Sequence, residues 1–193
     1  LIDMLNHHPY GPKYGRNEAK DWLIPVQHPV SGSEQCFVRY QKGDSLANAM
    51  WHGYFEGAPR YLSSVQCAFS DAIAGNVIVH GVHYQRRKLN APLVQRRDDG
   101  IDLHSIILDP ETLPALRTFL GLALRSKDRS LSQTAAERHA DSMIAAIIAA
   151  NRAYFRRLQV FCREAQDVFA LRPLMAQVAG HQLAILDGLQ AQP

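Results

Sequence analysis

The pattern of apolar and polar residues changes character near the middle of this chain. Up to about residue 108, apolar residues occur in short runs separated by turn-forming residues, as in 22–27 and in the alternating stretch 61–69. From Asp109 onward they recur every three or four residues over long stretches, which is typical of helices that bury one face. The pattern therefore predicts an α+β fold, with strands first and helices afterwards.

The first half is predicted to hold several short strands and one helix. Further strands are expected at 35–40, 76–82 and 101–108, and a turn at 71–75 joins two of the runs. Asp44 or Ser45 is suited to cap a short helix, and Gly53 is suited to end it. The second half of the chain follows a different plan.

Three helices in series are predicted after residue 108. Pro110 is expected in the first turn of one helix, and the capping-box pair Thr134 and Glu137 is expected to start a second helix of about 30 residues. Asn151 is the clearest polar residue in the apolar stripe of that helix, and a third helix is expected at 171–190. Short loops between these helices favour a small bundle, so we predict domains at 1–108 and 109–193.

Composition narrows the class of protein further. Of the 193 residues 47% are hydrophobic and 20% are charged, and no apolar run approaches the ~18 residues that span a bilayer, so we predict no membrane partner. The net charge of +3 does not support nucleic-acid binding. The basic stretch around 86–97 is read as a solvated loop or, alternatively, as a rim that contacts an acidic protein. Three widely spaced cysteines argue against a disulfide framework and favour a reducing compartment, the cytoplasm.

Two segments about thirty residues apart carry a family resemblance. The chain opens with Asp3-x-x-Asn6-His7, and residues 34–40 form a predicted strand that ends in Tyr40, followed by a short helix that ends in Gly53-Tyr54. Together they resemble the C-terminal half of a SET domain of the Rubisco large-subunit lysine methyltransferase group, which also has an actin-histidine methyltransferase branch. The resemblance implies the C-terminal part of a SET β-fold followed by an all-helical substrate-binding domain. It also implies methyl transfer from S-adenosylmethionine to a protein lysine.

Tyr40 is the residue that the resemblance makes catalytic. Methyl transfer to an amine needs a neutral nucleophile in line with the sulfonium, and a tyrosine hydroxyl can orient such an amine. Gln41 stands where the family usually has glycine. As an alternative, Tyr40 is simply a cross-strand aromatic residue.

The resemblance also implies four residues around the cofactor. Asn6 and His7 match the pair that contacts the amino-acid end of S-adenosylmethionine, and Tyr54 matches an aromatic residue that packs near it. Asp3 matches an acidic residue near the site, although it could equally cap a helix. We therefore predict Asp3, Asn6, His7 and Tyr54 as cofactor-binding residues.

Two further residues are predicted to line the substrate channel. Val38 matches an aliphatic channel position and also fits the core of a strand. His52 stands where lysine-methylating members carry a second tyrosine, which leaves a histidine acceptor open. No metal site is predicted, because the histidines and acidic residues form no H-E-x-x-H motif and no close cluster along the chain.

Two other functions stay open beside lysine methylation. One is a protein-histidine methyltransferase of the same family, and the other is a non-catalytic protein-binding module on a degenerate SET scaffold. Because Leu1 already lies inside the motif, the chain is expected to lack the N-terminal half of the SET domain. The parent protein is therefore expected to be the enzyme, with its helical domain binding the protein substrate, and this chain alone to be inactive.

Overall fold

The computed structural model describes residues 6–7, 15–19, 21–23, 37–38, 44–81, 92–164 and 170–190. The chain has an α+β fold, as predicted, and it divides into two compact units, 1–43 and 44–193. The boundary predicted at 108/109 falls inside the second unit and, as a division into functional domains, it stays a prediction.

The described residues of the first unit form two short strand pairs. Strand β1 (Asn6–His7) pairs in parallel with β4 (Phe37–Val38), and β2 (Gly15–Arg16) pairs antiparallel with β3 (Trp22–Leu23). Strands were predicted over 22–27 and 35–40, and the parts of these ranges outside β3 and β4 lie outside the described residues.

The second unit begins with the short helix α1 (Ser45–His52), which has both of its predicted ends. Asp44 is the N-cap, and its carboxylate accepts a hydrogen bond from the Ala47 amide at 2.8 Å. Gly53 closes the helix in the left-handed conformation, with a φ of 70°, and its amide donates to the carbonyl of Ala49 at 3.1 Å.

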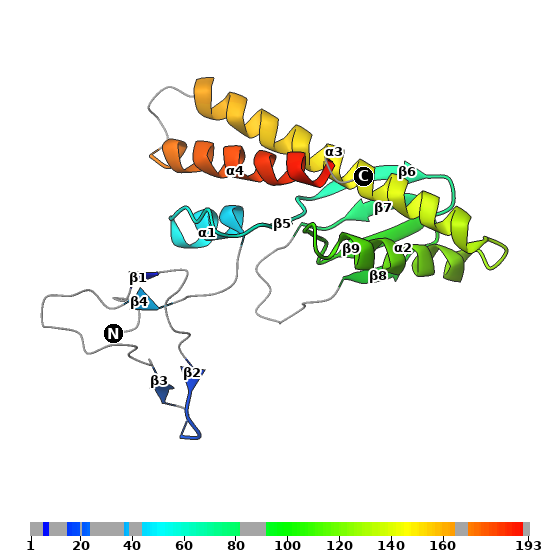
Figure 1. The fold of residues 1–193 in the computed structure, drawn as a ribbon, viewed down its shortest axis with the longest axis horizontal. Helices are drawn as coiled ribbons and strands as arrows, with labels where there is room; N and C mark the ends of the chain where they lie inside the picture. The colour runs from blue at the N-terminus through cyan, green and yellow to red at the C-terminus, as the bar shows by residue number, and fades with distance from the viewer. Residues whose placement is uncertain are drawn as a thin grey trace, which may run out of the picture. The chain divides into compact units, whose positions relative to one another are not determined.

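A four-stranded sheet forms one layer of this unit (Figure 1). Its strand order is β6 (Cys67–Asp71), β7 (Gly75–Val79), β9 (Gly100–His104) and β8 (Leu93–Arg96). Strands β7 and β9 are parallel, whereas the two outer pairs are antiparallel. The predicted turn between β6 and β7 is present. Strand β8 was not predicted, since Arg96 belongs to the basic stretch that we expected to be a loop.

The single strand predicted at 101–108 is two strands in the structure. Ser105 has a φ of 56°, and this left-handed residue separates β9 from β10 (Ile107–Leu108). Strand β10 pairs antiparallel with β5 (Leu62–Ser63) in a separate two-stranded sheet. The alternation of apolar residues also fails at this point, because Ser105 follows Ile101 and Leu103 and the buried positions resume at Ile106 and Leu108.

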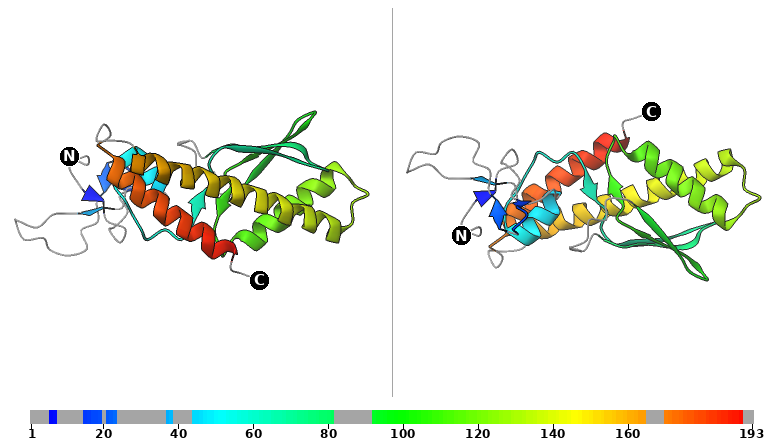
Figure 2. Two further views of the ribbon diagram at one scale, coloured as in Figure 1. Left: turned by 90° about the horizontal axis from the view of Figure 1, so that it is seen from above. Right: turned by 90° about the horizontal axis from the view of Figure 1, so that it is seen from below.

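Three helices follow, as predicted: α2 (Leu113–Lys127), α3 (Gln133–Glu164) and α4 (Arg172–Gln190). Two predicted starting points were wrong. Pro110 lies in the turn before α2, and Pro114 instead occupies the first turn of that helix. The N-cap of α3 is Ser132 rather than Thr134, and its hydroxyl accepts a hydrogen bond from the amide of Ala135 at 3.2 Å. The long α3 packs against α2 along one part of its length and against α4 along another (Figure 2).

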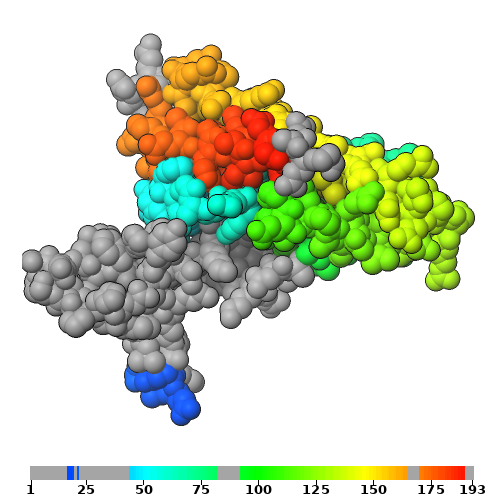
Figure 3. Space-filling model, in the orientation of Figure 1, coloured from blue at the N-terminus to red at the C-terminus, as the bar shows by residue number. Residues whose placement is uncertain are grey.

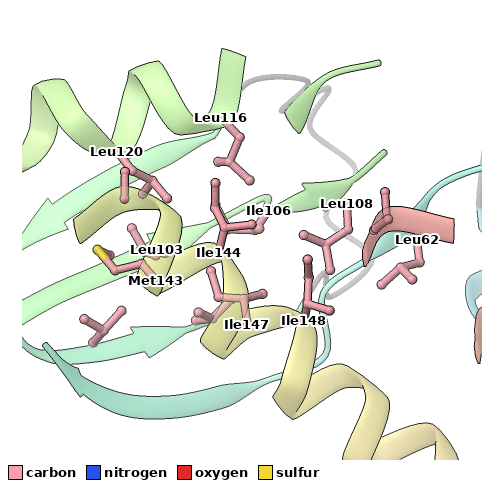
Figure 4. Close-up of a cluster of buried hydrophobic side chains, with 14 of the residues drawn as sticks. Leu62, Leu103, Ile106, Leu108, Leu116, Leu120, Met143, Ile144, Ile147 and Ile148 are labelled. Carbon is pink, nitrogen blue, oxygen red and sulfur yellow. The ribbon is translucent and has the colours of Figure 1, made fainter. Parts of the chain in front are cut away.

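Strands and helices of this unit share one hydrophobic core. Figure 4 shows Met143, Ile147 and Ile148 of α3 pointing toward Leu103 and Leu108 of the strands. The α2 side chains that close the same core are Leu116, Leu120 and Leu124. The helices are therefore not packed only on one another, because the buried stripe of α3 also covers one face of the sheet.

Candidate functional site

The predicted site residues fall in three groups. Asn6, His7 and Val38 lie in strands of the first unit, where the structure describes their backbone. His52 and Tyr54 lie at the end of α1 in the second unit. Asp3 and Tyr40, including the predicted catalytic hydroxyl, lie outside the described residues.

The strand pair β1–β4 brings two of the motif segments together. Asn6 is opposite Phe37 and His7 is opposite Val38, in a parallel register. The Asn-His pair therefore lies beside the strand segment that precedes Tyr40 by two residues, although about thirty residues of chain separate them. Backbone pairing of the two strands therefore brings Asn6, His7 and Val38 close together.

His52 and Tyr54 are neighbours in space through the turn at Gly53. The imidazole of His52 stacks on the phenol ring of Tyr54, with ring centroids 5.9 Å apart and an interplanar angle of 25°. His52 is exposed, whereas Tyr54 is half-buried. The left-handed conformation of Gly53 reverses the chain after α1, which lets two residues on either side of it face one another.

A buried polar cluster surrounds the N-terminal end of α1. One carboxylate oxygen of Asp44 caps the helix, and the other accepts from the Ser63 amide. The side-chain amide of Asn48 donates to Glu56 at 2.9 Å, and the Ser45 hydroxyl donates to the Glu56 carbonyl at 2.6 Å. These bonds fix the segment after the helix against the helix itself, since Asp44, Ser45 and Asn48 are all buried.

The Ser45 hydroxyl also contacts a histidine from the far end of the sequence. Its Oγ lies 2.9 Å from Nδ1 of His181, and Nε2 of His181 lies 3.0 Å from the Gly57 carbonyl oxygen. The edge of the Phe55 ring packs on the same imidazole at a centroid distance of 5.6 Å. In Figure 3, α1 (cyan) accordingly lies against α4 (orange to red).

This serine–histidine pair has the setting of a structural contact rather than of a nucleophile. Ser45 is completely buried, and its hydroxyl lies between the Glu56 carbonyl and Nδ1 of His181. A nucleophilic serine needs its oxygen exposed to a substrate and its proton directed to the histidine. The pair therefore holds α1 and α4 together.

Tyr61 lies in the electrostatic field of the same cluster. Burial, and after it the negative charges of Asp44, Glu56 and Asp109, raise the pKa of its hydroxyl to about 12. The phenol consequently stays protonated at neutral pH and can donate a hydrogen bond but cannot act as a base. Sequence analysis placed Tyr61 only in a strand.

Sequence reasoning missed Glu56 and His181 as partners of α1. Ser45 and His181 are 136 positions apart, so no local spacing connects them. One signal was present, because His181 interrupts the apolar stripe of the third predicted helix. A polar ring in such a stripe needs a buried partner, but the stripe does not say which residue supplies it.

Comparison of this chain with protein-family models, with curated proteins and with solved structures found no match. Among the described helices, none has the length and apolar character that crossing a membrane requires.

Proposed function

We propose that this chain forms part of an S-adenosylmethionine-dependent methyltransferase that modifies a lysine side chain of a protein. The observation that carries the proposal is the parallel pairing of β1 with β4. It sets Asn6 and His7 beside the strand that leads to Tyr40. A cofactor pocket of this kind has to combine these two elements, the Asn-His pair and that strand. Tyr40 itself lies outside the described residues.

The chemistry assigned to each element follows from methyl transfer. The amide of Asn6 can both donate to a carboxylate and accept from an ammonium group, which suits the amino-acid end of the cofactor. The Tyr40 hydroxyl would orient a neutral amine in line with the sulfonium methyl. His7 and Asp3 are the other proposed cofactor-binding residues of this segment. Val38 is proposed to line the channel that admits the acceptor side chain.

The end of α1 supports a further part of the proposal. Tyr54 is half-buried and stacked by His52, so its ring is held in place and can present an apolar face to the cofactor. His52 is exposed beside it, where an incoming acceptor side chain could be hydrogen-bonded. In this proposal Tyr54 contacts the cofactor and His52 lines the substrate channel.

The proposed partner is a protein, bound by the helices in the cytoplasm, with no role for nucleic acid or membrane. Val160 and Phe161 on α3 support this partner, since they are 39% and 56% exposed. Exposed apolar side chains mark a protein-binding site when they form a contiguous patch, and these two residues are proposed as part of one. Their role as a substrate contact rests on the proposed function.

The decisive variant is Tyr40→Phe in the full-length protein. Loss of the hydroxyl is expected to reduce methyl transfer by about 100-fold, or on the order of 3 kcal/mol, while S-adenosylmethionine affinity stays within about twofold. Tyr154→Phe, which removes a hydroxyl from α3, serves as the matched control. Turnover of the Tyr40 variant equal to that of the control would remove Tyr40 from the mechanism.

A second variant tests the cofactor side. Asn6→Ala is expected to weaken S-adenosylmethionine binding by about 1 to 3 kcal/mol, because a buried polar group of the cofactor loses its partner. Isothermal titration calorimetry measures the change, with Asn17→Ala as the control, since among the described residues Asn17 bonds to Asp21 in the β2–β3 turn. Unchanged affinity would reduce Asn6 and His7 to a structural role.

A protein histidine is the second candidate acceptor, because His52 stands where lysine-methylating members carry a second tyrosine. Analysis of the methylated amino acid in the product separates the two, because methyl-lysine and methyl-histidine differ in mass and chromatography. A full-length protein that binds a partner protein but neither binds S-adenosylmethionine nor transfers methyl groups would instead indicate a non-catalytic binding module.

A further inference from the structure

The parallel pairing of β7 with β9 gathers two histidines and an aspartate on one face of the sheet. Ile78 is opposite Asp102 and Val79 is opposite Leu103, and the amide of His80 donates to the Leu103 carbonyl at 2.8 Å. Side chains alternate between the two faces of a strand. His80 therefore falls on the same face as Asp102 and His104.

The opposite face of these strands is already occupied. Val77 and Val79 of β7, with Ile101 and Leu103 of β9, are buried in the core shared with α2 and α3. The face that carries His80 and Asp102 is turned away from that core. It is partly open, since the His80 side chain is 34% exposed and that of Asp102 is 16% exposed.

The three side chains converge closely enough to share one ion. One ligand atom from each of His80, Asp102 and His104 can be chosen so that all three lie within 4.8 Å of one another. Nε2 of His80 is 3.4 Å from Oδ2 of Asp102, and the two imidazole rings stack at a centroid distance of 4.4 Å.

Several polar atoms of this group are buried without a hydrogen-bond partner. They are Nε2 of His80, Nε2 of His104 and Oδ1 of Asp102, as judged within the part of the chain that the structure describes. Buried polar atoms are normally satisfied, and an unsatisfied one costs about 1 to 3 kcal/mol. Oδ1 of Asp102 lies within ion-pair distance of Arg97, so the two imidazole nitrogens, in their unprotonated form, are the atoms that offer lone pairs to a metal ion.

We propose that His80, Asp102 and His104 bind a divalent transition-metal ion of the zinc class. Two imidazole nitrogens and one carboxylate oxygen are ligands that such an ion prefers, and three protein ligands leave a further position for water or a substrate group. The exposure of His80 gives that position access to solvent. The site uses none of the residues assigned to the proposed methyltransferase pocket and does not depend on that function.

The neighbouring charges suit a cation. Nε of Arg97 lies 3.3 Å from Oδ1 of Asp102 and 3.5 Å from Oδ1 of Asp99. Two carboxylates and one guanidinium leave a formal charge of −1 near the ion. Arg97 also holds one oxygen of Asp102, which orients the other oxygen toward His80, as partners of metal ligands commonly do.

Binding requires one rotation. The imidazole rings of His80 and His104 are parallel within 4°, so their Nε2 lone pairs do not point at a single position. Turning one ring about its Cβ–Cγ bond makes them converge, and this torsion has broad, shallow minima. We expect this side-chain rotation to close the site around the ion.

The test measures Zn²⁺ binding to the untagged 193-residue chain by competition with a chromophoric chelator. One ion per chain is expected, and Asp102→Asn and His104→Gln are each expected to weaken the affinity at least about 10-fold. His139→Gln is the matched control, because His139 also pairs with an aspartate, Asp71, at 3.1 Å, but no second histidine joins that pair among the residues that the structure describes. The Zn²⁺ affinity of the His139→Gln variant should equal that of the unmodified chain.

Two further measurements do not depend on the folding of the variants. With Co²⁺ as the probe, the absorption spectrum should show nitrogen and oxygen ligation without the charge-transfer band of a thiolate, which excludes the cysteines. Addition of Zn²⁺ should shift the imidazole nitrogen resonances of His80 and His104 and leave those of the other histidines in place. A thiolate band, shifts confined to other histidines, or Zn²⁺ affinity that survives replacement of all three ligands would each overturn the proposal.

Discussion

At the residue scale, single polar side chains fix the ends of strands and the contact between sheet and helix. Asn151 is completely buried in α3, where its carbonyl oxygen accepts from the Val65 amide at 2.9 Å and its amide donates to Ser64 at 2.8 Å and to Ile147 at 2.9 Å. The sequence identified Asn151 as the polar residue of an apolar stripe. Its partners could not be predicted, since two of them lie more than 80 positions away.

Asp71 has a similar role at the β6–β7 turn and gives a pH-dependent prediction. Its side chain is 7% exposed, and its carboxylate accepts from the amides of Ile73 and Ala74 at 2.8 and 2.7 Å and contacts His139 at 3.1 Å. Burial acts to raise the pKa of Asp71, but these hydrogen bonds outweigh it and lower the pKa below the ordinary value. The stabilisation is therefore fully present above about pH 4 and is lost as the pH falls through the lowered pKa.

Asp71→Asn is expected to lower the free energy of unfolding by about 1 to 2 kcal/mol at pH 7, because a charged acceptor of several hydrogen bonds is lost. The difference from the unmodified chain should shrink as the pH falls below about 4. Urea unfolding at a series of pH values measures it. A difference that stays constant from pH 7 to pH 3 would show that the charge of Asp71 contributes nothing.

At the scale of the element, the sequence predicted the helices better than their first residues. Thr134 and Glu137 have the spacing of a capping box, yet the N-cap of the helix lies two residues earlier. Ser132 caps it, with its hydroxyl accepting from Ala135 at 3.2 Å and its carbonyl accepting from Ala136 at 2.9 Å. Two hydroxyl residues so close together offer two caps, and the sequence alone does not rank them.

The cap assignment can be tested with a matched pair of variants. Ser132→Ala is expected to lower the stability by about 1 kcal/mol through loss of the N-cap. Thr134→Ala should be neutral or slightly stabilising, because Thr134 is exposed inside the helix and alanine has the higher helix propensity. Urea midpoints of the two variants decide between the caps, and a larger loss for Thr134→Ala would reverse the assignment.

At the scale of the whole second unit, the limits of sequence reasoning come from non-local strand pairing. The change of pattern near residue 108 marks where strands give way to helices, and the structure has that order of elements. The pattern does not reveal that β7 and β9 are parallel neighbours, or that β8 lies at the edge. For the same reason the cluster of His80, Asp102 and His104 was not predicted, since only the pairing of β7 with β9 brings His80 to the other two residues.

The shared core changes the expectation for the helical half on its own. Its apolar stripe fits a small bundle, but in the structure Met143, Ile147 and Ile148 of α3 belong to the same core cluster as Leu103 and Leu108. Without the strands, these α3 side chains would be exposed to water, each at a cost of about 1.5 to 3 kcal/mol. The helices would then lose specific packing before they lost helical structure.

We therefore expect residues 109–193 alone to be helical but loosely packed, whereas 44–193 should unfold in one cooperative transition. Circular dichroism in the far and near ultraviolet separates the two, because the shorter chain should keep the helical signal and lose the aromatic one. Amide exchange in α3 should accordingly be slow in 44–193 and fast in 109–193. A sharp, cooperative unfolding transition of 109–193 with slow exchange in α3 would show instead that the helices form an independent domain, with its boundary at 108/109.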